Sequence, residues 1–172
     1  LIIGAGGFGR EVLWTINGCN EIKKKYLVLG FIDDDKSLHG DLIDGFSVLG
    51  GLNWIEKNYQ KSISCVIAIG DSLKKKEMVN QLKKIDPTYA TIIHPTVISS
   101  KSITIGEGTI IQAGTIMTIN IVIGKHVHLN IDSTVGHDTV IEDYVTINPG
   151  VHINGKTTIG SMFYARLKEV KN

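Results

Sequence analysis

Residues 105–160 have the sequence IGEGTIIQAGTIMTINIVIGKHVHLNIDSTVGHDTVIEDYVTINPGVHINGKTTIG, in which every sixth residue, counted from the first, is apolar. A period of six matches neither the 3.6 residues of a helical turn nor the two-residue repeat of an ordinary strand. It is typical of a parallel β-helix, in which each hexapeptide supplies one short strand and three strands complete a coil. The repeated apolar residues are Ile105, Ile111, Met117, Ile123, Leu129, Val135, Ile141, Ile147, Ile153 and Ile159.

The residues two positions before these are nearly all β-branched, from Ile103 to Thr157, and such side chains favour strands. Three hexapeptides make a coil of 18 residues, so the sequence predicts that Ile105, Ile123 and Ile141 stack in one column. A single repeat cannot bury its own apolar side, which is why the repeats must form an array. We therefore predict a β-helix over residues 93–160, followed by a short helical tail over 161–172.

Residues 1–92 show a different pattern, in which short apolar runs alternate with helical periodicity. The expected strands include 1–3, 26–32, 64–69 and 89–93, and the expected helices follow residues 7, 51 and 71, the first of them ending at Gly18. Alternating strands and helices predict a parallel sheet. We expect a small α/β domain with a Rossmann-like sheet.

The first strand runs into a glycine-rich loop that contains Gly4, Gly6, Gly7 and Gly9. The spacing Gly-x-Gly-x-x-Gly before a helix allows the backbone to approach a phosphate group. Asp33 and Asp34 follow the second apolar run, where an acid that binds ribose would stand. The alternative is that the glycines only permit a tight turn and that the acids are solvated. The domain has too few strands for a full dinucleotide fold, so a nucleotide-sugar suits it better than NAD.

Composition excludes several other classes of protein. The formal charge of +1 and the absence of a long apolar run argue against nucleic-acid binding and membrane insertion. The lysine run 74–76 is expected to be solvated. Two distant cysteines and the lack of a targeting segment favour a cytoplasmic protein. His126 and His128 have no third ligand at useful spacing, so we expect no metal and assign both to packing or solvent.

His137 is the candidate general base, because imidazole titrates near neutrality and stands here beside the carboxylate of Asp138. Neighbouring strand residues point to opposite faces, so Asp138 can orient the ring only if the turn bends it back. Gly155 lies one coil further on, where its N–H could stabilise a developing oxyanion, and Asn130 is placed to contact a substrate. The alternative is an exposed turn histidine without a catalytic role.

Seven stretches carry a resemblance to a known family: Gly4–Glu11, Phe31–Asp34, Ile69–Asp71, Ile93–Pro95, Val135–Asp138, Ile141–Asp143 and Ile147–Val151. In these motifs the chain resembles the NeuD/PglD family of bacterial sugar acetyltransferases, which act in glycan biosynthesis. The resemblance implies a left-handed β-helix and a homotrimer that binds acetyl-CoA between neighbouring helices. It also implies a nucleotide-sugar held by the N-terminal domain, His137 as the base beside Asp138, Asn130 near the substrate and the Gly155 N–H facing the thioester carbonyl.

The chain departs from the family pattern at two places. Some relatives carry a second histidine near the acetyl group, where this chain has Thr146, which is therefore a candidate for acetyl-CoA contact. The family usually continues with further coils that wall the CoA site, and these are not expected here after Gly160.

We therefore predict an acetyl-CoA-dependent transferase that acetylates an amine or hydroxyl of a sugar by direct attack on the thioester. The alternatives are a catalytically impaired trimer, with a truncated β-helix, that binds a nucleotide-sugar or serves as a scaffold, and, less favoured, an NAD-dependent enzyme.

Overall fold

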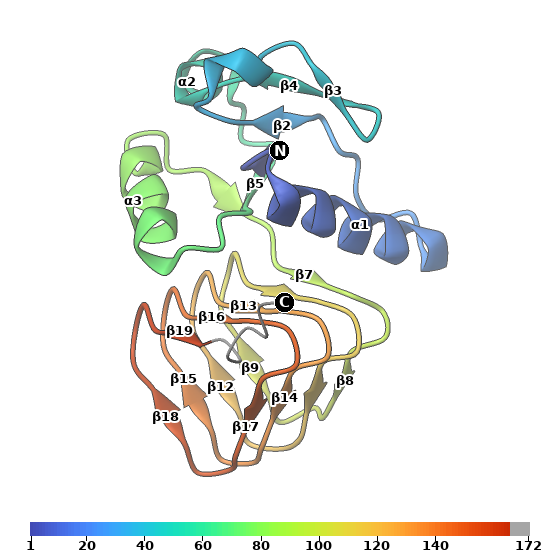
Figure 1. Ribbon diagram of the computed structural model, residues 1–172, viewed down its shortest axis with the longest axis vertical. Coiled ribbons are helices and arrows are strands. Elements are labelled where there is room, and N and C mark those ends of the chain that lie inside the picture. Colours follow the sequence, from blue (N-terminus) through green and yellow to red (C-terminus); the bar gives the residue numbers. More distant parts are fainter. Residues whose placement is uncertain (166–172) are drawn as a thin grey trace, which may run out of the picture.

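The structure, a computed structural model, describes residues 1–165 of the chain. An α/β domain at the N-terminus lies over one face of a triangular prism of short parallel strands (Figure 1). The prism is a left-handed parallel β-helix, and the predicted fold class is confirmed. None of the helices within residues 1–165 is long and apolar enough to cross a bilayer.

The N-terminal sheet has six strands in the order β3-β4-β2-β1-β5-β6. All neighbours pair in parallel except β3, which forms an antiparallel hairpin with β4. The buried strand β1 lies inside the sheet, so the loop that follows it emerges at the carboxyl edge. The strands are β1 (Ile2–Ile3), β2 (Phe31–Ile32), β3 (Leu42–Ile43), β4 (Phe46–Gly50), β5 (Ser64–Ile67) and β6 (Thr88–Tyr89).

Three α-helices and one 3-10 turn accompany this sheet. The Asp71 carboxylate accepts a hydrogen bond from the Lys74 N–H at 2.9 Å, so this residue caps α3. Buried Val12, Leu13 and Ile16 of α1 belong to a core that also contains strand residues. The helical segments are α1 (Gly7–Ile22), η1 (Lys36–Leu38), α2 (Leu52–Asn58) and α3 (Ser72–Leu82).

The prediction that Gly18 ends the first helix is wrong, because α1 continues to Ile22. A Cβ atom at Gly18 would lie 2.7 Å from the Nε2 of His94, the residue that follows strand β7 (Ile92–Ile93). The same histidine stacks on Trp14 of α1, with ring centroids 5.1 Å apart. This glycine therefore permits close packing of the helix against the prism rather than a helix stop.

The prism has three faces, and each face is a sheet of strands spaced 18 residues apart in the chain. Ile105, Ile123, Ile141 and Ile159 occupy one register column, as predicted. The first face consists of β7, β10 (Ile110–Ile111), β13 (His128–Leu129), β16 (Thr146–Ile147) and β19 (Tyr164–Ala165).

The second and third faces have four strands each and carry no part of the N-terminal sheet. The second face consists of β8 (Ile98–Ser99), β11 (Ile116–Met117), β14 (Thr134–Val135) and β17 (His152–Ile153), and the third of β9 (Thr104–Ile105), β12 (Val122–Ile123), β15 (Val140–Ile141) and β18 (Thr158–Ile159).

Residues in the left-handed conformation turn the chain at the corners of the prism. Asn120, Asp138 and Lys156, at φ of 52°, 56° and 57°, repeat at one corner, while His126 and Tyr144 repeat at another. This conformation is uncommon for residues other than glycine, asparagine and aspartate. Its recurrence every 18 residues fixes where each corner side chain points.

The helical tail predicted over residues 161–172 is wrong for its described part. Tyr164–Ala165 form β19, which pairs with β16 of the preceding coil. Ala165 stands six residues after Ile159 and continues the inward column with a small side chain. Residues 166–172 lie outside the described residues. The strand predicted over 89–93 is also divided between β6 of the sheet and β7 of the prism.

The first face carries the junction between the two parts of the chain. Ile92 and Ile110 share a core cluster with Ile2 and Val12. Lys75 of α3, which we expected in solvent, is fully buried there. Its Nζ donates to the Val145 carbonyl at 3.2 Å and to the Thr146 Oγ1 at 2.9 Å.

Two glycines at the start of α1 differ in the space available for a side chain. At Gly9 in α1, an added Cβ would overlap the Gly4 carbonyl oxygen, whereas at Gly7 it would meet no atom within 4 Å. We expect Gly9→Ala to destabilise the protein by roughly 2 kcal/mol or more, since a backbone atom must move. The matched variant Gly7→Ala should stabilise by up to about 1 kcal/mol, as alanine favours a helix. Urea unfolding of both variants tests this, and equal effects would contradict it.

Lys75→Met should stabilise the protein by roughly 1 kcal/mol or more near pH 7. Burial lowers the pKa of Lys75 well below 10.5, so folding must remove its proton or bury its charge at neutral pH. This cost decreases as the pH rises toward the pKa that Lys75 has in the unfolded chain, so the gain in stability from Lys75→Met should be smaller at pH 10. Both acceptors keep another partner, since Val145 O also accepts from the His128 N–H and Thr146 Oγ1 donates to Gly70 O.

Denaturation curves of wild type and Lys75→Met at pH 7 and pH 10 provide the measurement. A variant that is less stable than wild type at both pH values would show that the amine contributes net stabilisation through its two hydrogen bonds.

Candidate active site

His137 and Asp138 lie at the corner between the second and third faces, directly after β14 and Gly136. Asp138 has a φ of 56°, and this left-handed turn bends its side chain back toward its neighbour. The His137 Nδ1 and the Asp138 Oδ2 lie 2.8 Å apart. The turn therefore bends Asp138 back toward His137, as is required for Asp138 to orient the ring. Both side chains remain about half exposed, at 54% and 47%.

The charge of this pair follows from its hydrogen bonds. Donation from His137, and then from Asn120, holds the pKa of the Asp138 carboxyl below its usual range. The carboxylate is thus ionised at neutral pH and accepts the Nδ1–H of the imidazole. We assign this tautomer from the contact, and it leaves the Nε2 lone pair free to accept a proton.

Gly155 lies under the imidazole. A Cβ at this residue would lie 2.7 Å from the His137 Nε2, so a larger residue would displace the ring from this position. A Cβ at Gly136 would likewise overlap the Gly155 backbone. The Gly155 N–H finds no backbone acceptor among residues 1–165. The base nitrogen and an available backbone donor are therefore neighbours at the same corner.

The glycine loop lies at the carboxyl edge of the N-terminal sheet. Gly4 has a φ of 108°, and a Cβ there would lie 2.6 Å from the Ala68 carbonyl oxygen. Gly6 and Gly7 face open space, with no atom within 4 Å of an added Cβ. Gly4 therefore serves packing, while Gly6 and Gly7 leave the N-terminus of α1 accessible to an anion.

Asp33 and Asp34 have different surroundings. Asp33 accepts the Ala5 N–H at 2.8 Å and the Asp35 N–H at 3.0 Å, so both of its oxygens stabilise the loops around the glycines. Asp34 accepts the Leu52 N–H at 3.3 Å and lines a cavity of about 560 Å³ between η1 and α2. Asp33 therefore stabilises the loops, while Asp34 is the acid that faces the cavity.

Sequence reasoning missed the other polar and aromatic residues of this cavity. They come from the segment after Asp34 and from α2, and no regular spacing in the sequence connects these two segments. The sequence feature that could have indicated the cavity is the cluster of acidic residues that precedes Gly50 and Gly51. These residues are Lys36, His39, Asn53, Trp54, Lys57 and Asn58.

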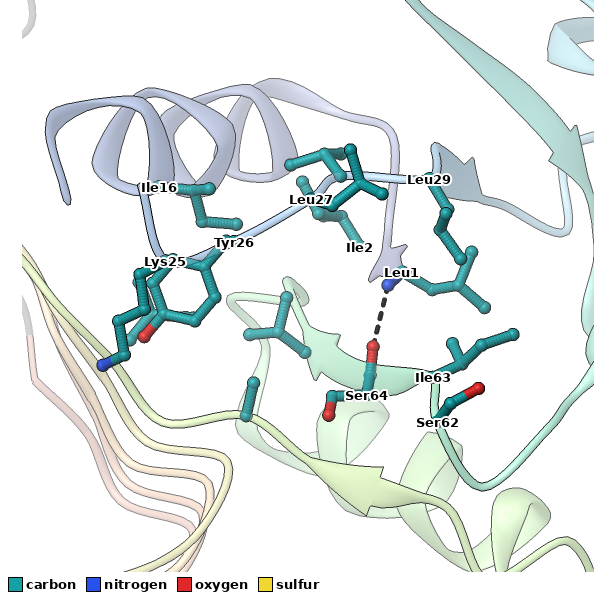
Figure 2. Close-up of a pocket in the computed structure, with 14 residues that line it drawn as sticks. Leu1, Ile2, Ile16, Lys25, Tyr26, Leu27, Leu29, Ser62, Ile63 and Ser64 are labelled. Atoms are coloured by element: carbon teal, nitrogen blue, oxygen red, sulfur yellow. Dashed lines mark hydrogen bonds between the residues drawn. The ribbon is translucent and has the colours of Figure 1, made fainter. Parts of the chain in front are cut away.

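A second cavity, of about 410 Å³, lies at the opposite edge of the sheet (Figure 2). Leu1, whose amino group donates to the Ser64 carbonyl at 2.8 Å, lines it together with Tyr26 and Ile63. These residues stand before or at the beginning of the strands, whereas the glycine loop follows a strand. This cavity is therefore separate from the predicted nucleotide site.

Asn130 and Thr146 belong to the first face and not to the His137 corner. Asn130 is 5% exposed, donates to Asn148 at 3.4 Å, and its Oδ1 lacks a partner among residues 1–165. Thr146 is fully buried, accepts from Lys75 and donates to the Gly70 carbonyl at 2.8 Å. These contacts do not fit the predicted contact of Thr146 with acetyl-CoA, because α3 and the Gly70 loop cover its hydroxyl.

His126 and His128 are packing residues. His126 lies between Tyr89 and Tyr144, and burial lowers its pKa to about 4. His128 packs against Phe8, and burial lowers its pKa as well. Among residues 1–165, no three His, Cys, Asp or Glu side chains are grouped so as to hold a metal ion.

The predicted site residues thus form two groups on different sides of the prism. His137, Asp138 and Gly155 meet at the corner opposite the first face, while the glycine loop and Asn130 lie on the side of the first face (Figure 1). Within one chain, the prism separates the candidate base from the candidate sugar site.

Comparison with known proteins gives consistent matches over both parts. The PglD N-terminal domain family matches residues 1–82. GDP-perosamine N-acetyltransferase of Escherichia coli O157:H7 is 34% identical over 167 residues, covering 95% of this chain and 73% of that protein. UDP-N-acetylbacillosamine N-acetyltransferase of Bacillus subtilis is 29% identical over 121 residues, covering 65% and 50%.

A mutant of perosamine N-acetyltransferase from Caulobacter crescentus, solved with CoA and GDP-perosamine, has the same fold. Its TM-score is 0.85 at 22% identity, over 95% of this chain and 74% of that one. The identity and coverage of the E. coli relative, together with this agreement in fold, establish that the chain belongs to the NeuD/PglD-type family of sugar acetyltransferases.

Proposed function

We propose that this protein transfers the acetyl group of acetyl-CoA to an amine of a nucleotide-linked sugar, with His137 as the general base. The observation that carries the proposal is the His137–Asp138 contact of 2.8 Å, which leaves Nε2 free above Gly155. The E. coli relative is named for N-acetylation of a GDP-linked sugar, which favours an amine over a hydroxyl as the acceptor.

The chemistry requires two proton transfers, both through His137, and no covalent enzyme intermediate. His137 Nε2 removes a proton from the amine as its nitrogen attacks the thioester carbonyl. The oxyanion of the tetrahedral intermediate accepts the Gly155 N–H, and its collapse breaks the carbon–sulfur bond. The CoA thiolate leaves and takes the proton from the imidazolium, while Asp138 stabilises the charged ring between these steps.

The N-terminal part is the proposed sugar-nucleotide site. The open Gly6 and Gly7 allow phosphate to approach the N-terminus of α1. The cavity beside Asp34 offers Trp54 for stacking and Lys36 and Lys57 for charge, which suits a nucleoside diphosphate. We assign nucleotide-sugar binding to the N-terminal α/β domain and acyl transfer to the β-helix that begins with β7.

We further propose that the active enzyme is a homotrimer. A sugar held at the glycine loop lies across the prism from His137 of the same chain, so the site is complete only with a second copy. The second and third faces expose apolar side chains suited to a subunit contact. Those side chains are Ile98, Ile116, Val122 and Val140, exposed by 64%, 39%, 47% and 38%.

His137→Ala should lower kcat by about 10²–10⁴, since it removes the general base, with little effect on KM. Release of free CoA thiol with acetyl-CoA and a panel of GDP- and UDP-linked amino sugars provides the measurement. His137→Asn keeps most of the side-chain volume and controls for packing at the corner. Turnover near that of wild type in both variants would remove His137 from the mechanism.

Calorimetry with acetyl-CoA separates this proposal from a catalytically impaired scaffold trimer. The proposal predicts that wild type and His137→Ala both bind acetyl-CoA. A wild-type protein that forms trimers without binding acetyl-CoA would favour the scaffold function.

A further inference from the structure

Asn120 lies at the same corner as Asp138, one coil earlier in the β-helix. Its side-chain Nδ2 donates a hydrogen bond to the Asp138 Oδ1 at 3.3 Å. The other carboxylate oxygen, Oδ2, accepts from the His137 Nδ1 at 2.8 Å. The two oxygens of Asp138 therefore have one donor each, and three side chains form a continuous chain of hydrogen bonds.

This arrangement restricts a carboxylate that is otherwise free to rotate. The Asp138 side chain is 47% exposed, so packing restrains it only in part. A carboxylate with a single donor can turn about its χ2 torsion, which has a broad energy profile. A donor on each oxygen fixes the carboxylate plane, and the plane sets the direction in which His137 presents Nε2.

Asn120 is itself held in place by the coil before it. Its backbone N–H donates to the Ser102 Oγ at 3.0 Å, and this hydroxyl lies 2.7 Å from the Ser100 Oγ. On the other side of Asp138, Lys156 occupies the next coil at the same corner and contributes charge without a hydrogen bond. Asn120 is thus the neighbour in this column that fixes the carboxylate by direct contact.

The corner conformation alone does not explain an asparagine at this position. Asn120 has a φ of 52°, but equivalent corners are occupied by His126, Tyr144 and Lys156 with similar φ values. Many side chains are therefore tolerated at such corners. What distinguishes Asn120 is an amide group that donates to the carboxylate beside the candidate base.

We propose that Asn120 is a positioning residue for acetyl transfer, acting through Asp138 to align the imidazole of His137 above Gly155. The proposal rests on the proposed function of His137. It extends that function by a third residue, which touches neither substrate nor thioester and controls the geometry of the base.

Two substitutions test this role. Asn120→Gly removes the amide and keeps the left-handed backbone accessible. We expect kcat to fall about tenfold with KM unchanged, the change that corresponds to losing one hydrogen bond to a charged group. Asn120→Asp keeps the shape but places a second carboxylate against Asp138, and like charges disfavour a shared ionised state. Its kcat should be lowest at high pH and should recover relative to wild type as the pH falls, because the introduced carboxyl can donate again once it is protonated.

A readout independent of turnover keeps this test separate from the proposed function. Carboxyl carbon NMR should show that the pKa of Asp138 rises in Asn120→Gly, because one donor to its ionised form is lost. The control Asp132→Asn, at a corner residue with a φ of 58° between the first and second faces, should change neither this pKa nor kcat.

The outcomes are distinguishable. An unchanged Asp138 pKa, or wild-type kcat and pH dependence in both Asn120 variants, would overturn the positioning role. If His137→Ala retains turnover while the Asp138 pKa still rises in Asn120→Gly, the hydrogen-bond chain stands and the assignment of the base fails.

Discussion

The regular stacking of one coil on the next is the constraint on which the structure depends. Each residue of the β-helix lies about 4.8 Å from the residue 18 positions away, the spacing of hydrogen-bonded strands. Burial of the inward columns, from Ile111 to Ile147, fixes this register, because a slip would expose the apolar set. The same spacing places Gly155 beneath His137 and Asn120 beside Asp138. The arrangement of donors and acceptors at this candidate catalytic corner is therefore a consequence of core packing.

The six-residue period allowed most of the β-helix and of the His137 corner to be predicted from the sequence. The columns, the faces and the proximity of His137 to Gly155 follow from counting by six. The turn that brings Asp138 back to its neighbour required a backbone torsion, φ of 56°, that residue types do not determine. Ala165 escaped prediction because its side chain is small, although it continues the inward column.

The errors concentrate at the junction between the sheet and the prism. Lys75 belongs to a charged run and Thr146 to a strand, and nothing local indicates that each is the other's buried partner. Gly18 resembled a helix stop, but its role is to leave space for the ring of His94 on the other side of the junction. Tertiary contacts between segments 70 or more residues apart override local propensity at such places. The cavity beside Asp34 was missed for a similar reason, since its lining comes from two separate segments.

The separation of the two halves of the candidate site within one chain underlies our proposal that the base of one copy acts on a sugar held by its neighbour. Mixed oligomers test this most directly. His137→Ala disables the base, and Gly7→Glu places a carboxylate in the open loop, where it should repel phosphate. If the two variants are inactive alone, their coexpressed mixture should recover about one quarter of wild-type activity, because random assembly joins an intact base to an intact neighbouring loop at one interface in four. A mixture no more active than the separate variants would contradict a shared site.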